Sequence, residues 1–296
     1  MKAVLYSRPE IFLRPNALER LVEALGKHGI DYMLSTAAAD RWEEATGKTL
    51  PATARYDEIR ESFPADADLM ICYGGDGTFL DGVRLLNHST VPMLGINAGH
   101  LGFLTNVAGE EIEAVVAEIA AGKYGIEERS TLNVTDGFSG GIEFPHAINE
   151  FTIQKKGPMM VSVDVFIDGE RVTAYLGDGL ILSTPTGSTA YSLSAGGPIV
   201  APDVRCLVIS PIASHNLTIR PLVVPDSCRM SFRVRSRSGG PAWASLDNRN
   251  YEVPDGTVFS VEKSGKPVFL VKLHTISFYR TLREKMMWGV DTRHKV

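Results

Sequence analysis

The chain has 296 residues, of which 44% are hydrophobic and 22% are charged, values that are ordinary for a globular protein of about two domains. Its 30 basic and 35 acidic residues give a net charge of −5, so no positive field would hold it on nucleic acid, and we expect no nucleic-acid partner. The apolar start is too short for a signal peptide and no apolar run could span a bilayer, so we expect a cytoplasmic protein without a membrane partner.

The first hundred residues alternate short apolar runs with amphipathic stretches, which is the pattern of an α/β layer. Asn16 is expected to cap a helix whose apolar residues recur at helical spacing and which ends at Gly29. Strands are expected at residues 2–6, 31–34, 69–73 and 92–96. This order predicts a Rossmann-like N-terminal domain with a mainly parallel sheet.

Residues 37–68 are polar and weakly patterned, so we expect a surface insertion with a short helix at 56–63 and assign it no function. A helix with apolar residues on one face follows and ends at Gly122. Beyond it, alternating runs such as Val161 to Ile167 predict an antiparallel all-β domain.

The chain becomes helical again near its end, with Phe278, Leu282 and Met286 along one side. We expect this C-terminal helix to return to the first domain. The predicted boundaries are therefore 1–106 with 276–296 for the α/β domain and 107–275 for the β-rich domain.

A glycine-rich turn carrying one carboxylate joins the strand at 69–73 to a helix start. Gly74, Gly75 and Gly77 leave backbone N–H groups free to approach an anion at the positive end of that helix. Asp76 would repel a bound phosphate, so we consider two functions for it: accepting the proton of a hydroxyl that is about to be phosphorylated, or reaching Mg²⁺ held by the phosphates. The alternative is a turn whose residues only satisfy backbone geometry.

Neither of the two common nucleotide motifs is present in the sequence. No Gly-x₄-Gly-Lys-Ser/Thr occurs, and no Gly-x-Gly-x-x-Gly follows a predicted strand. A second loop, at residues 95–104, leaves the next strand of the same sheet, so we expect it to share a crevice with the glycine turn. His100 in this loop is either a proton carrier or a histidine bound by neighbouring backbone.

Two further segments lie in the β-rich domain. Residues 177–198 are dense in glycine and small hydroxyl residues, which suits a polar or sugar-bearing ligand with Tyr191 available for stacking, or else a connecting loop. Asn149 and Glu150 place an amide beside a carboxylate, a pair able to hold ribose hydroxyls or to lie in a solvated turn.

Taken together and in this order, these four elements resemble the NAD kinase family, over roughly residues 69–247. The resemblance implies transfer of the γ-phosphoryl group of ATP to the adenosine 2′-hydroxyl of NAD. It also implies Mg²⁺ or another divalent cation, held through the ATP phosphates rather than by protein side chains. A homo-oligomer, dimer or tetramer, is implied as well, with the dinucleotide site partly crossing a subunit boundary.

The same resemblance assigns functions to individual residues. Asp76 matches the catalytic aspartate of the family. The matching nucleotide-binding positions are Gly75, Gly77, Thr78, Phe103, Asn149, Glu150, Asp178, Thr186, Thr189, Ala190, Tyr191, Ser194 and Asp247.

The sequence departs from the family at two places. Asp247 keeps its position, but the residues after it read Asn248-Arg249 where relatives often have a Gly-Gln-like turn. Leu176 stands where some relatives carry a basic residue. Two alternatives stay open: a lipid or sphingoid kinase, which shares the Gly-Gly-Asp-Gly turn, and a catalytically silent nucleotide-binding regulator. The sequence leaves open whether polyphosphate or NADH is accepted.

Overall fold

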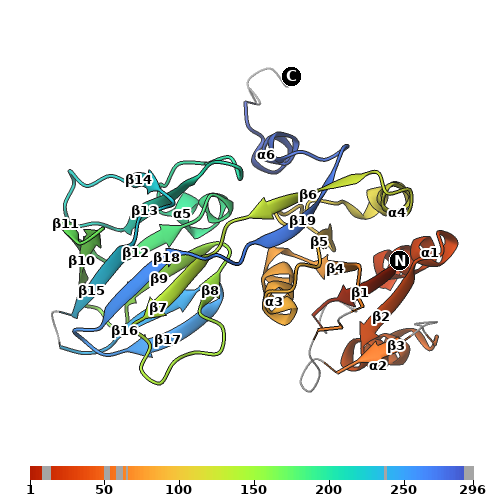
Figure 1. Ribbon diagram of the computed structural model, residues 1–296, viewed down its shortest axis with the longest axis horizontal. Coiled ribbons are helices and arrows are strands. Elements are labelled where there is room, and N and C mark those ends of the chain that lie inside the picture. The colour runs from red at the N-terminus through yellow and green to blue at the C-terminus, as the bar shows by residue number, and fades with distance from the viewer. Residues whose placement is uncertain (9–14, 50–53, 58–62, 65, 237–238, 290–296) are drawn as a thin grey trace. The chain divides into compact units, whose positions relative to one another are not determined.

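The structure, a computed structural model, describes residues 1–8, 15–49, 54–57, 63–64, 66–236 and 239–289 (Figure 1). The chain divides into two compact units, Met1–Glu127 with Val268–Val296, and Glu128–Pro267. We refer to them as the α/β unit and the β unit. Within the described part of the chain, no helix is long and apolar enough to cross a membrane.

The α/β unit is built on a seven-stranded sheet in the order β3-β2-β1-β4-β5-β19-β6. Strands β1, β2, β3, β4 and β5 pair in parallel, and β19 pairs in parallel with β5. The strands are β1 (Lys2–Tyr6), β2 (Asp31–Ser35), β3 (Ala54–Tyr56), β4 (Leu69–Gly74), β5 (Met93–Asn97), β6 (Tyr124–Arg129) and β19 (Val268–Leu273). The predicted Rossmann-like sheet is confirmed.

Helices cover both faces of this sheet, because side chains alternate along each strand. Leu5 and Ile71 face one core cluster with helices α1 (Pro15–Lys27), α2 (Thr36–Thr46) and α4 (Ile112–Ala120). On the opposite face, α3 (Asp76–Leu86) lies so close to β4 that a Cβ on Gly82 would be 2.6 Å from the Cys72 sulfur. The close packing of α3 fixes the direction in which its N-terminus points.

Two local predictions in this unit are wrong. The helix after β1 already begins at Pro15, so Asn16 lies inside it and is not the cap. Residues 37–68 are not a surface insertion, because α2 buries Trp42 in the core and β3 is the edge strand of the sheet. Tyr56 belongs to that strand, and the rest of the helix predicted at 56–63 falls largely on residues outside the described ones.

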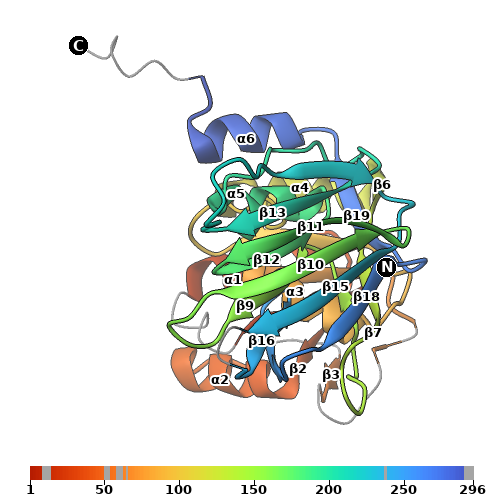
Figure 2. The same ribbon diagram turned by 90° about the vertical axis from the view of Figure 1, so that its left-hand side faces the viewer.

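The β unit consists of two six-stranded sheets in which the strands of the described part of the chain pair antiparallel, and Figure 2 shows β10, β15 and β18 side by side in one of them. The sheet orders are β11-β10-β15-β18-β7-β8 and β14-β13-β12-β9-β16-β17. The strands are β7 (Leu132–Asp136), β8 (His146–Ala147), β9 (Glu150–Lys155), β10 (Val161–Ile167), β11 (Glu170–Gly177), β12 (Gly179–Ser183), β13 (Cys206–Ile212), β14 (Leu222–Pro225), β15 (Met230–Ser236), β16 (Ala242–Leu246), β17 (Arg249–Val253) and β18 (Val258–Lys263).

One apolar cluster joins the two sheets of the β unit. Phe151 of β9 stacks edge-on to Phe259 of β18 with ring centroids 5.0 Å apart, and Phe232 of β15 lies 5.9 Å from Phe151. The alternation predicted for residues 161–167 holds for its valines, which are buried. Asp164 is the exception: its carboxylate is buried and paired with Arg171 at 2.9 Å and Arg235 at 3.0 Å.

The boundary between the units lies at 127/128 and 267/268, whereas the sequence analysis placed it at 106/107 and 275/276. The difference arises because α4 packs on the parallel sheet and because β6 and β19 complete that sheet. The C-terminal helix α6 (Phe278–Met286) belongs to the α/β unit, as predicted.

Candidate functional site

The glycine turn connects β4 to α3 at the carboxyl edge of the parallel sheet. Gly75 occupies the position before the helix, and Asp76 is the first helical residue. The Gly75 carbonyl accepts the N–H groups of Thr78 at 2.9 Å and Phe79 at 3.2 Å, which begins the helix. An acidic side chain in the first turn is favourable there because the helix dipole is positive at its N-terminus.

The carboxylate of Asp76 is held by a single loop, residues 102–105, which follows β5. Its Oδ1 accepts hydrogen bonds from the N–H groups of Leu104 at 3.0 Å and Thr105 at 2.9 Å, and from the Thr105 hydroxyl at 3.0 Å. Its Oδ2 accepts the N–H of Phe103 at 3.0 Å. Because a carboxylate oxygen can accept about two hydrogen bonds, Oδ1 is saturated and Oδ2 has the spare accepting capacity.

Gly102 lets this loop approach the carboxylate. A Cβ at this position would lie 2.0 Å from Asp76 Oδ1 and 2.4 Å from the Thr105 hydroxyl oxygen, distances that no real contact allows. Any side chain at residue 102 must therefore displace either the carboxylate or the loop. Gly102 lies in the loop predicted at residues 95–104, whereas no sequence signal marks Thr105, because its contribution depends on how the loop folds back.

Two further side chains, Phe103 and Arg8, lie at the loop and the turn that surround Asp76. Phe103 stacks at 6.0 Å from Phe278 of α6, and its backbone binds the carboxylate. Arg8, which follows β1, donates to the Gly77 carbonyl at 3.2 Å and pairs with Asp81 at 2.5 Å. Arg8 was not predicted as a site residue, because nothing in its local sequence connects it to the turn.

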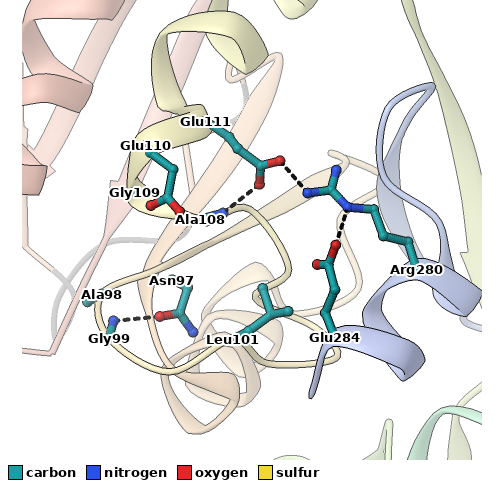
Figure 3. Close-up of a pocket in the computed structure, with 10 residues that line it drawn as sticks. All are labelled: Asn97, Ala98, Gly99, Leu101, Ala108, Gly109, Glu110, Glu111, Arg280 and Glu284. Atoms are coloured by element: carbon teal, nitrogen blue, oxygen red, sulfur yellow. Dashed lines mark hydrogen bonds and ion pairs between the residues drawn. The ribbon is translucent and has the colours of Figure 1, made fainter. Parts of the chain in front are cut away.

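A cavity of about 650 Å³ adjoins this loop in the α/β unit, and Figure 3 shows the side chains that line it. Arg280 of α6 spans one side and pairs with Glu111 at 2.8 Å and Glu284 at 2.9 Å. Across the cavity, Asn97 accepts the N–H of Gly99. The exposed His100 is in the same loop, and its carbonyl accepts a hydrogen bond from the Asn97 amide.

In the β unit, the half-buried carboxylate of Asp247 binds the backbone of two other residues predicted to bind the nucleotide, Asn149 and Glu150. Asp247 lies in the turn between β16 and β17 with φ of 50°. Its Oδ1 accepts the N–H groups of Asn149 at 2.8 Å and Glu150 at 3.3 Å, and its Oδ2 accepts that of Ile148 at 3.1 Å. Burial raises the pKa of Asp247, although these hydrogen bonds oppose the rise.

Glu150 is a buried acid beside a second acid. Burial, and after it the charge of Asp247, raises the pKa of Glu150 to about 8. One of its oxygens accepts the N–H of Tyr191, whereas Oε2 has no hydrogen-bond partner among the described residues. At neutral pH Glu150 is therefore largely protonated and can donate an O–H to a ligand.

The segment after β12 folds tightly over Asn149. A Cβ on Gly187 would lie 2.1 Å from the Asn149 carbonyl oxygen. The hydroxyl of Thr186, in the short helix η3 (Thr186–Thr189), is buried and has no hydrogen-bond partner in the described part of the chain. Tyr191 begins the short helix α5 (Tyr191–Ser194) and is 37% exposed, so its ring can be reached by a ligand.

Several hydroxyl groups of this segment already form hydrogen bonds within the protein. Thr184 donates to the Ile148 carbonyl at 2.5 Å, Ser188 donates to the Pro185 carbonyl at 2.7 Å, and the hydroxyls of Ser192 and Ser210 lie 2.9 Å apart. Among the predicted site residues, Thr189 donates to the Thr186 carbonyl at 3.2 Å. Thr189 and Ala190 are half-buried, and Ser194 is exposed.

Asp178 lies between strands β11 and β12 and forms an ion pair with Lys155. Its Oδ1 lies 2.6 Å from the Nζ of Lys155, and both side chains remain partly exposed. Leu176, at the position where some relatives are basic, is half-buried in β11, and Lys155 brings a cation to this end of the strands. Lys155 was not predicted as a site residue, because its contact with Asp178 depends on the pairing of β9 with β12.

Side chains that could bind a divalent cation do not cluster. Among the residues that the structure describes, no three His, Cys, Asp or Glu side chains form a group able to hold a metal ion. The carboxylate nearest the glycine turn, Asp76, already accepts four hydrogen bonds.

The raised pKa of Glu150 predicts a dependence of stability on pH. Between the ordinary pKa of 4.5 and about 8, the unfolded chain releases this proton and the folded chain keeps it, so stability falls as pH rises through that window. We expect wild type to lose about 3 kcal/mol more unfolding free energy than Glu150→Gln between about pH 5.5 and about pH 8.

Guanidinium unfolding at the two pH values measures this difference. The exposed Glu170 of the same unit provides the control, because Glu170→Gln should leave the pH dependence of wild type unchanged. Identical pH dependence in wild type and Glu150→Gln would show that Glu150 is ionised in the folded protein.

Comparisons with known proteins agree with the geometry of both units. The ATP-NAD kinase N-terminal domain family matches residues 13–124, and the ATP-NAD kinase C-terminal domain family matches residues 148–273. The NAD kinase of Cytophaga hutchinsonii is 42% identical over 77% of this chain and 78% of that protein. The NAD kinase of Bacteroides fragilis is 36% identical over 92% of this chain and 93% of that protein.

Two solved structures share the fold. Yeast NADH kinase complexed with NADH superposes with a TM-score of 0.85 at 25% identity, covering 100% of this chain and 90% of that one. An NAD kinase from Archaeoglobus fulgidus in complex with ATP gives a TM-score of 0.75 at 25% identity, covering 97% of this chain and 99% of that one. The chain belongs to the NAD kinase family.

Proposed function

We propose that the protein transfers the γ-phosphoryl group of ATP to the adenosine 2′-hydroxyl of NAD, giving NADP and ADP. The observation that carries the proposal is the carboxylate of Asp76, fixed at the first residue of α3 with Oδ2 able to accept a further hydrogen bond. Family membership supports the reaction class and both substrates.

In this reaction Asp76 is the general base. Its Oδ2 takes the proton of the 2′-hydroxyl as that oxygen attacks the γ-phosphorus, and the bond from the γ-phosphorus to the β-bridging oxygen breaks to release ADP. The turn residues Gly75, Gly77 and Thr78 lie at the N-terminus of an 11-residue helix, where backbone N–H groups and the helix dipole favour donor phosphates.

The β unit provides the residues proposed to recognise NAD. The buried amide of Asn149 and the neutral carboxyl of Glu150 can bind hydroxyl groups, and Asp247 positions both through their backbone. The hydroxyl of Thr186, buried without a partner in the described structure, is expected to bind the ligand as well. Phe103, Asp178, Thr189, Ala190, Tyr191 and Ser194 are proposed to complete the contacts with the nucleotide.

A divalent cation, Mg²⁺ or a similar ion, is proposed to enter with ATP. It would be held by the phosphate oxygens, with Asp76 the nearest carboxylate of the turn, and it would neutralise charge on the phosphoryl groups. The assembly as a dimer or tetramer and the location in the cytoplasm stay predictions. An assay of product formation with polyphosphate in place of ATP, or with NADH in place of NAD, tests whether the protein accepts these substrates.

Replacing Asp76 with Asn tests the base. Asn keeps the size of the side chain but cannot take a proton, so kcat for NADP formation should fall by roughly 10² to 10⁴ while NAD affinity changes by less than about threefold. A coupled NADP assay and calorimetry with NAD measure the two quantities.

The exposed Asp203, which is not among the predicted site residues, supplies the matched control, since Asp203→Asn removes the same charge and should retain full activity. Activity of Asp76→Asn within a few-fold of wild type would refute the assignment of the base. Phosphorylation of diacylglycerol or a sphingoid base, with none of NAD, would instead favour a lipid kinase.

Replacing Gly102 with Ala tests the positioning of the carboxylate. The added methyl must displace Asp76 or the loop, so kcat should fall by at least about tenfold with an unfolding free energy within about 2 kcal/mol of wild type. Gly26→Ala in α1, where a Cβ meets nothing within 4 Å, is the control and should be fully active. Normal kcat in Gly102→Ala would show that this packing does not matter for catalysis.

A further inference from the structure

Lys285 of the C-terminal helix reaches the open side of the Asp76 carboxylate. Its Nζ lies 3.7 Å from Oδ2, the oxygen that has the spare accepting capacity, and 4.9 Å from the centre of the Phe103 ring. The separation of 3.7 Å is longer than a direct hydrogen bond, and both side chains are about one-third exposed, 36% and 32%. The ammonium group is therefore close to Oδ2 without being locked to it.

The helix that carries Lys285 is fixed within the α/β unit. Ser277 caps its N-terminus by accepting the N–H of Arg280 at 3.2 Å. The Arg280 guanidinium binds Glu111, Glu284 and the Thr275 carbonyl, at 2.8, 2.9 and 3.0 Å, and Figure 3 shows its two ion pairs. Phe278 packs on Phe103 at 6.0 Å. These contacts hold the backbone of Lys285 while its long side chain stays free to turn.

The proposed reaction leaves a charge problem at this place. The γ-phosphoryl group must come within about 3 to 3.5 Å of the attacking hydroxyl oxygen, and that hydroxyl must reach Asp76 Oδ2. An anionic phosphoryl group and a carboxylate then lie a few ångströms apart, and their repulsion is unfavourable. The motif in which a P-loop lysine contacts the phosphates is missing from the sequence, and Arg8 is already paired with Asp81 at 2.5 Å.

We propose that Lys285 is a catalytic residue that binds the γ-phosphoryl group of the donor, turning from Asp76 Oδ2 to the phosphoryl oxygens when ATP is bound. This inference rests on the proposed function and adds a residue to it. Lys285 takes no part in the proton transfer: the hydroxyl proton passes to Asp76, the new oxygen–phosphorus bond forms, and ADP leaves with the electrons of the broken bond.

The test compares ATP with ADP, because only ATP carries the group that Lys285 is proposed to bind. Calorimetry of the full chain with each nucleotide and Mg²⁺, without NAD, gives the two dissociation constants. Lys285→Met should weaken ATP binding by about tenfold and ADP binding by less than about twofold. In the coupled assay kcat should also fall at least about tenfold while KM for NAD changes by less than about threefold.

Two further variants keep the test specific. Arg283→Met removes a cation from an exposed position of the same helix and should behave as wild type with both nucleotides. Lys285→Arg preserves the charge and should recover most of the ATP affinity. Equal loss of ATP and ADP affinity in Lys285→Met, or no loss of either, would overturn the proposal.

A different result would refute the proposed function. If wild type forms no NADP from NAD and ATP, the reaction itself is refuted. If wild type forms NADP while Lys285→Met and Arg283→Met bind ATP equally well, only the assignment of Lys285 is refuted.

Discussion

The hydrogen bonds from one loop to the carboxylate of Asp76 are the interaction on which the site depends. Three backbone N–H groups and the Thr105 hydroxyl hold this side chain at the N-terminus of α3. The parallel sheet positions both partners, since β4 leads into the helix and β5 leads into the loop. The packing of α3 through Gly82 and the missing side chain at Gly102 are the steric conditions for this contact.

The β unit uses the same device on another loop. Asp247 accepts hydrogen bonds from the backbone N–H groups of Ile148, Asn149 and Glu150, and these bonds hold Asn149 and Glu150 at the start of β9. In both units a carboxylate holds a backbone segment that is distant in the sequence, and at Asp76 the Thr105 hydroxyl adds a fourth hydrogen bond. The two carboxylates differ in their effect on the site: Asp76 keeps an accessible oxygen, whereas the charge of Asp247 contributes to the raised pKa of Glu150.

Several parts of this architecture could be predicted from the sequence. Apolar runs located β1, β2, β4 and β5, and the glycine turn located the start of α3, because both signals are local. Residues 37–68 were misjudged because α2 has a short apolar face built from Ala38, Ala39 and Trp42, whose burial depends on the helices around them. The prediction for Asn16 is wrong because a cap there would start the helix at residue 17, whereas the helix starts two residues earlier, at Pro15, which is well suited to a first turn.

The contacts that define the site were less predictable than its motifs. Asp76 and Asp247 were identified by resemblance, but the sequence did not reveal that each binds a distant backbone segment. Thr105, Lys155 and Lys285 meet their partners only through strand pairing or helix docking, so no local pattern marks them. The pKa of Glu150 is likewise a property of burial beside Asp247, which spacing alone does not give.

The central claim is that the loop at residues 102–105 holds Asp76 so that Oδ2 can take a proton. The most direct measurement is the single-turnover rate of phosphoryl transfer to NAD in Thr105→Val, which loses one donor to the carboxylate, and in Thr105→Ser, which keeps it. We predict a rate about tenfold lower for Thr105→Val and within about twofold of wild type for Thr105→Ser. An unchanged rate in Thr105→Val would contradict the account.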